Sequence, residues 1–220
     1  MQCSKCKREA ILYQPYSGQH LCGEHMIIDI ETKAKRTIRQ HRGMQPGDTI
    51  AVILRGNAAD NALLFFLQKL TENRRDIRVS GVRGDPLTGN FTKTAHDTGA
   101  TRIALSTTLE DASAEVLSGL IRGDFVKCPS VDPKSQGALP IITPFCHIPA
   151  GEIALYARIL EIAEDRIYDI QEDDSLNHDV KAMLADYSHR HPAAPYAILN
   201  LADSLELMCS NPDGGSGHGA

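Results

Sequence analysis

The sequence predicts an α/β fold in which helices cover both faces of an open parallel sheet, behind a small head rich in cysteine and histidine. The run from Thr49 to Leu54 is apolar at nearly every position, as in a strand buried on both faces of a parallel sheet. A polar loop and an apolar-periodic helix follow it, and the order of strand, loop and helix then repeats along the chain. These observations predict one main α/β domain.

The head, residues 1–26, contains two half-sites for a metal ion, Cys3-x2-Cys6 and Cys22-x2-His25, with fifteen residues between them. Two thiolates from one turn can meet a thiolate and an imidazole from a second turn at tetrahedral angles around zinc. Four protein ligands leave no position for water, so the pattern predicts a structural zinc ribbon. Incidental cysteines in an N-terminal arm are the alternative. An iron–sulfur cluster is not expected here, because a fourth cysteine would then replace His25.

Residues 27–46 form a basic connector with helical periodicity. Its apolar residues recur at helical spacing and its basic residues fill much of the remainder, the latter being Lys33, Lys35, Arg36, Arg39, His41 and Arg42. This pattern predicts a basic amphipathic helix. Its polar face is either simply solvated over an apolar seam or directed toward RNA.

The predicted body spans residues 47–207 and begins at a turn, Pro46-Gly47-Asp48. Predicted strands occupy 49–54, 76–82, 101–105 and 141–142, and predicted helices occupy 62–70, 91–98, 110–121, 150–163 and 177–187. Residues 208–220 are rich in glycine and serine and lack apolar periodicity, so we expect a disordered tail.

Composition narrows the class of protein. The chain has 220 residues, 42% hydrophobic content and a net charge of −5, so nucleic-acid binding would need a local basic patch. No run approaches the ~20 apolar residues of a membrane span, and the N-terminus lacks the apolar segment of a signal peptide. Six cysteines are too few for a disulfide scaffold at this length. We therefore expect a soluble cytoplasmic protein without a membrane partner.

The loop from Arg55 to Asp60 follows the first strand of the body, where open α/β sheets bind anions. With the head, this segment resembles the PP-loop ATP pyrophosphatases that thiolate tRNA uridines, whose Rossmann-like fold is of the adenine nucleotide alpha hydrolase type. The family's phosphate loop reads S-G-G-x-D-S. When residues 55–60 are aligned with this loop without gaps, only Gly56 is identical, at the first glycine. Asn57 then aligns with the second glycine, Ala59 with the aspartate and Asp60 with the final serine.

Later segments extend the resemblance. Residues 121–124 are similar to the family's L-R-G-D, residues 144–157 to P-L-x-x-I-P-E-K-E-V-A-L-Y-A, and His191-Pro192 to the start of H-P-G-x-x-x-x-L. Asp111 falls on the last residue of a segment that resembles A-T-G-H-N-x-D-D. Asp111 and Arg122 also have a structural interpretation, because both could serve only to begin and end a helix.

The resemblance implies a nucleotide site at Arg55, Gly56, Asn57, Asp60 and Asp111, with ATP and magnesium as its ligands. The catalytic residues of this chain stay unassigned. The second loop glycine is missing, and residues 77–102 contain no cysteine where the family has a C-x-x-C for a catalytic iron–sulfur cluster or redox thiols. Binding of ATP and magnesium therefore stays open.

We accordingly predict a divergent relative of ATP-dependent tRNA 2-thiolation proteins whose catalysis is lost or altered, and which binds tRNA or a thiolation-pathway protein. A homodimer is left open. The alternative is an active adenylating tRNA sulfurtransferase that uses ATP and an external sulfur donor. Cys128 and Cys146 are interpreted as small buried hydrophobes, with a soft-metal or nucleophile site beside His147 as the alternative. Cys209 falls in the predicted tail.

Overall fold

A computed structural model of the chain describes residues 1–41, 43–83, 95–123, 139–162 and 175–210. The head is a hairpin of two antiparallel strands, β1 (Leu12–Gln14) and β2 (Gln19–Leu21). The body contains a parallel sheet of four strands in the order β4-β3-β5-β6, formed by β3 (Thr49–Leu54), β4 (Arg78–Arg83), β5 (Arg102–Ala104) and β6 (Ile141–Ile142). The helices are α1 (Gly23–Gln40), α2 (Ala58–Thr71), α4 (Leu109–Arg122), α5 (Ala150–Ile159), α6 (Ser175–Arg190) and α7 (Ala194–Ser210).

Strand β3 lies inside the sheet and explains the continuous apolar run. Its four residues from Ile50 to Ile53 are fully buried. Ile50 and Val52 join a core cluster with residues of α1, α2 and α5, whereas Ala51 and Ile53 join a second cluster on the other face. Because side chains alternate along a strand, a strand buried on both faces needs apolar residues at every position. The predicted open parallel sheet with helices on both faces is confirmed.

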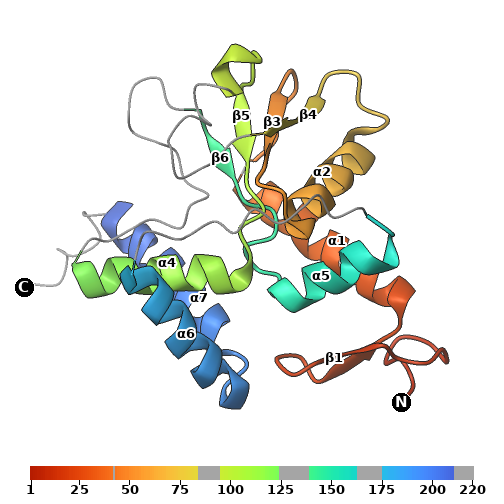
Figure 1. Cartoon of the computed structure of the whole chain (residues 1–220), viewed down its shortest axis with the longest axis vertical. Coiled ribbons are helices and arrows are strands. Elements are labelled where there is room, and N and C mark those ends of the chain that lie inside the picture. The colour runs from red at the N-terminus through yellow and green to blue at the C-terminus, as the bar shows by residue number, and fades with distance from the viewer. Residues whose placement is uncertain (42, 84–94, 124–138, 163–174, 211–220) are drawn as a thin grey trace, which may run out of the picture.

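The helices divide into two groups. Figure 1 shows α2 beside the sheet and α1 and α5 between the sheet and the head, while α4, α6 and α7 lie together beyond the ends of β5 and β6. The second group packs around its own apolar clusters, in which Leu109 and Val116 of α4 contact Leu199 and Ala202 of α7. The carboxyl ends of the strands therefore face the junction between the two groups.

Several element bounds differ from the prediction. Helix α1 begins at Gly23, so the predicted head and basic connector share one helix. Helix α7 was not predicted, and it extends to Ser210, three residues into the segment predicted as tail. This helix begins between Pro192 and Pro195 and is held by burial of Leu199 against α4. Helix 91–98 lies partly outside the described residues, as does the predicted tail from residue 211.

Helix α4 has strong signals at both ends. The Thr108 hydroxyl accepts from the Asp111 backbone N–H, and the Asp111 carboxylate accepts from the Thr108 N–H at 3.1 Å, which completes a capping box. Gly123, with φ of 77°, closes the other end in the left-handed conformation. The structural interpretation of Asp111 therefore accounts for its contacts within α4.

Replacing Thr108 with alanine should destabilise the chain by about 1 kcal/mol, because the first turn of α4 loses its side-chain acceptor. Urea denaturation measures this difference. The matched control is Thr107→Ala, one residue earlier, which removes a hydroxyl outside the capping box. Equal midpoints for the two variants would contradict the capping role.

Candidate functional site

The four predicted metal ligands converge in the head. Cys22 Sγ lies 3.8 Å from Cys6 Sγ and 3.3 Å from His25 Nδ1, and Cys3 Sγ lies 3.6 Å from the same nitrogen. All four donor atoms lie within 4.8 Å of one another. Zinc–sulfur bonds near ~2.3 Å at tetrahedral angles place two thiolates roughly 3.8 Å apart. The donor set and its spacing therefore fit one tetrahedral ion.

Local structure explains how the ligands are placed. Cys3 and Cys6 lie in a tight turn in which the Lys5 N–H donates to Cys3 Sγ, while Cys22 is the N-cap of α1 and His25 lies in its first turn. Burial raises the pKa of Cys3, but hydrogen bonds from the backbone of Cys22, Lys5 and Cys6 outweigh it and lower that pKa to about 6. A thiolate is the form that binds metal.

The head is joined to the body by a buried polar network that sequence reasoning missed. The Glu152 carboxylate on α5, which is only 4% exposed, accepts from the Tyr16 hydroxyl at 2.5 Å and from Gln14 Nε2 at 3.1 Å. Lys33 Nζ donates to the same hydroxyl at 2.7 Å and pairs with Asp29 at 2.6 Å. Burial raises the pKa of Glu152 even though the hydrogen bonds from Tyr16 and Gln14 and the charge of Lys33 lower it. In the sequence, the one indication of this network is Glu152, a carboxylate on the apolar side of the predicted helix 150–163.

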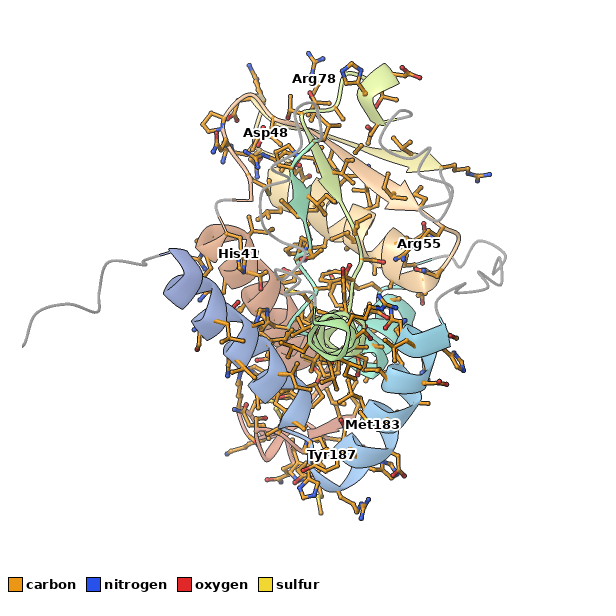
Figure 2. All side chains as sticks on the ribbon, turned by 90° about the vertical axis from the view of Figure 1, so that its left-hand side faces the viewer. His41, Asp48, Arg55, Arg78, Met183 and Tyr187 are labelled. Atoms are coloured by element: carbon orange, nitrogen blue, oxygen red, sulfur yellow. The ribbon has the colours of Figure 1, made fainter. Side chains whose placement is uncertain are left out.

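In the loop after β3, the structure brings Arg55 and Asp60 together with Ser106. The fully buried Asp60 carboxylate accepts from the Arg55 backbone N–H at 2.6 Å, from Arg55 Nη2 at 2.9 Å and from the Ser106 hydroxyl at 2.5 Å. Gly56 adopts φ of 94°, and the Asn57 side chain caps α2 by accepting from the Asp60 N–H. Figure 2 shows Arg55 in the middle of the molecule, at the opposite end of the sheet from Asp48 and Arg78.

This loop thus already contains an anion. The Asp60 carboxylate lies in the first turn of α2 and occupies these donors, and the start of a helix is where backbone N–H groups commonly bind phosphate. Ser106 was not among the predicted site residues, although it directly follows the predicted strand 101–105 and therefore had to lie at the same edge of the sheet. Asp111 is not part of this group: it pairs with Lys181 of α6 at 3.0 Å.

The basic face of α1 is partly used inside the molecule. Lys33 belongs to the network around Glu152, and Lys35 pairs with Glu31 at 3.5 Å. Arg36 and Arg39 are exposed, and Arg42 lies outside the described residues. The surface available to a polyanion on this helix is therefore smaller than the sequence indicated.

Of the remaining cysteines, Cys146 is fully buried in the cluster between α4 and α7, with Sγ 3.1 Å from His147 Nδ1. Its burial agrees with the interpretation as a small hydrophobe. Cys128 lies outside the described residues, as does the side chain of Cys209. Among the described residues, no helix is both long and apolar enough to cross a bilayer.

The fold and the head together define a class of protein: a parallel α/β domain with a polar loop after a central strand, preceded by a hairpin that is flanked by four side chains able to hold a metal ion. Comparison with known proteins narrows this class. The family model for the N-terminal LIM domain of 2-thiouridine synthetase TtuA matches residues 2–25. Cytoplasmic tRNA 2-thiolation protein 1 of Laccaria bicolor is 21% identical in a match covering 93% of this chain and 75% of that protein.

Two further comparisons agree. The tRNA 2-thiolation protein NcsA of Haloferax volcanii is 42% identical over 48 residues, which are 22% of this chain and 15% of that protein. The solved structure of the U34-tRNA thiolase NcsA from Methanococcus maripaludis has a TM-score of 0.78 at 18% identity and covers 93% of this chain. The predicted resemblance is confirmed: the chain is similar to tRNA 2-thiolation proteins over most of its length.

One prediction is contradicted. An iron–sulfur cluster was not expected, but the Methanococcus NcsA structure, which has this fold, contains a 4Fe-4S cluster. The prediction relied on cysteine spacing along the chain. A cluster needs thiolates that are close in space, so sequence spacing was an insufficient reason to exclude one.

Proposed function

We propose that this chain binds tRNA in a thiolation pathway and no longer adenylates it. The observation that carries the proposal is the buried Asp60 carboxylate, which accepts the Arg55 N–H, the Arg55 guanidinium and the Ser106 hydroxyl. A phosphate entering this loop would meet a carboxylate at close range and would find those three donors already used. Repulsion between two anions in a buried site is costly.

The sequence of the loop supports the same proposal. Placing S-G-G-x-D-S as above leaves Asn57 where the second glycine stands. If the motif is instead aligned with residues 56–61, Asp60 matches the aspartate, and Asn57 and Ala58 align with the two glycines. Either way a side chain stands where the family brings bare backbone close to pyrophosphate.

In this proposal the head is a structural metal site in which one zinc ion is held by Cys3, Cys6, Cys22 and His25. The head also helps to form the tRNA-binding surface, together with the exposed Arg36 and Arg39 of α1. The names of the relatives support tRNA as the partner and the cytoplasm as the location. A thiolation-pathway protein is the alternative partner, and a homodimer is compatible with either.

An active adenylating tRNA sulfurtransferase is the second candidate function. It is favoured by the extent of the fold shared with Methanococcus NcsA and by the retained order of strand, loop and helix around Gly56. In this candidate Asp60 would turn toward magnesium when ATP binds, and Arg55 would contact phosphate.

The decisive experiment incubates the purified chain with magnesium, ATP and unmodified tRNA and follows AMP and pyrophosphate. We expect no turnover, and no ATP binding by calorimetry at millimolar concentration. Turnover that is abolished by Asp60→Ala would show that the chain is an active adenylating enzyme. It would contradict the proposal that adenylation is lost.

Binding of tRNA is expected to weaken steeply with salt, and the double variant Arg36→Ala/Arg39→Ala should reduce the slope of log K against log salt by about 1 to 2. Anisotropy of labelled tRNA, recorded at several salt concentrations, measures this slope. Arg74→Ala/Arg75→Ala is the matched control, because both arginines are exposed and precede β4 on another surface. An identical slope in both double variants would remove α1 from the RNA-binding surface.

A further inference from the structure

A cavity of about 550 Å³ lies where the metal-binding head meets the body. One wall is the hairpin, with Tyr13, Pro15 and Tyr16, and the facing walls are the first turns of α4, α5 and α7 together with one side of α6. Its volume is in the range of small-ligand sites. None of the predicted nucleotide-loop residues lines it.

Aromatic rings and prolines form much of the lining. Tyr16 is fixed through its hydroxyl by Glu152 and Lys33, and its ring lies 4.9 Å from that of Tyr196. Tyr13 is stacked on His20 at 4.7 Å and is half exposed at the cavity edge. Four prolines complete the lining: Pro15, Pro149, Pro192 and Pro195. Side chains that lose little freedom on binding favour a preformed site.

The polar groups lie at the border of these aromatic walls. Lys181 and His189 lie on α6, and Glu110 lies at the start of α4, where it accepts the Ala150 N–H at 2.9 Å. Leu109 and Glu110 line the cavity, and Ser106, three residues before Leu109, contacts the loop carboxylate. The cavity and the loop therefore adjoin the same end of α4.

We propose that this cavity binds one unstacked nucleobase of an RNA. Single-stranded bases are recognised by stacking on tyrosines, with polar side chains reaching their edges. The lining offers three tyrosines for the ring and both a carboxylate and basic groups at the border. The inference rests on the proposed tRNA binding, and it adds the site at which a base is held. Because the hairpin forms one wall, the site also depends on the metal that orders the head.

The test uses two single-tryptophan variants on one helix. Ala185 is exposed and lines the cavity, so Ala185→Trp should fill it; Ala182 is exposed on the same helix and does not line it, so Ala182→Trp is the matched control. Loss of one stacked base should weaken tRNA about 5- to 150-fold in the first variant only. Anisotropy of labelled unmodified tRNA gives both affinities. Equal affinities would overturn the cavity proposal while leaving tRNA binding intact.

A second series separates stacking from folding. Tyr13→Phe keeps the ring and should bind as the wild type does, whereas Tyr13→Ala should lose affinity by a similar factor. If the wild type does not bind tRNA, the proposed function fails, and the four ribonucleoside monophosphates then test the cavity directly by titration monitored by NMR. Binding that Ala185→Trp abolishes would sustain the cavity site, and no binding of any of them would overturn it.

Discussion

Cys22→Ser is expected to release the metal and unfold the head. Cys22 is only 3% exposed, supplies one of four donors and caps α1, so its loss affects the ion and the start of the helix together. Structural zinc sites contribute an apparent binding free energy of about 10–16 kcal/mol near neutral pH, and removing one thiolate forfeits a large part of it. Metal content per chain measures the first effect, and limited proteolysis measures the second.

The consequence should reach the body. Leu21 and Met26, which flank the ligands, are fully buried in the same core cluster as Ile50 and Phe66. Unfolding of the head would expose part of the core, so we expect a single melting transition of the whole chain at lower temperature. A separate early transition would show instead that the head unfolds alone.

His25→Cys is the control for the metal site. The metal-facing atom of His25 is Nδ1, the ring nitrogen nearer the backbone, so a cysteine can bring sulfur to nearly the same place. This variant should keep one ion and the wild-type proteolysis pattern. Full metal content in Cys22→Ser would contradict the assignment of four ligands. Iron and sulfide in the wild-type protein would show that the head holds an iron–sulfur cluster and not zinc.

Local patterns were enough to predict some of this molecule. The convergence of Cys3, Cys6, Cys22 and His25 follows from spacing, because the two residues of each pair are three positions apart and lie in one local segment. Strand β3 follows from its unbroken apolar run, and α4 from the threonine before it and Gly123 after it. In each case the forces that decide the structure act between residues close in sequence.

Contacts between distant residues could not be predicted in the same way. Tyr16 and Glu152 are 136 positions apart, and Asp60 and Ser106 are 46 apart. Their pairing depends on how the head is placed on α5 and on the order of strands in the sheet. The sequence placed Asp60 in the implied nucleotide site, but only the three-dimensional arrangement shows that its carboxylate is paired with Arg55 and accepts from Ser106.

Asp60→Ala should be the most destabilising change in the body. It removes the acceptor of hydrogen bonds from Arg55 and Ser106 at a fully buried position, and breaking a buried ion pair on one side costs about 3–5 kcal/mol. The Arg55 side chain is 24% exposed, so water can partly solvate it and the lower end of this range is expected. Urea denaturation gives the free energy of unfolding.

Asp76→Ala is the matched control, because Asp76 pairs with Arg74 at 2.6 Å while both side chains are nearly half exposed. An exposed pair contributes about 0–1 kcal/mol. The two variants therefore differ in the burial of the ion pair and in the hydrogen bonds that Asp60 also accepts from the Arg55 N–H and Ser106. Equal destabilisation would mean that the Asp60 carboxylate is solvated and leaves the loop free for phosphate.

The more conservative Asp60→Asn keeps an acceptor for the Arg55 N–H and removes the charge. If the carboxylate is what excludes phosphate, this variant should gain stabilisation by pyrophosphate that the wild type does not show, because Arg55 and the start of α2 would then face an anion without a competitor.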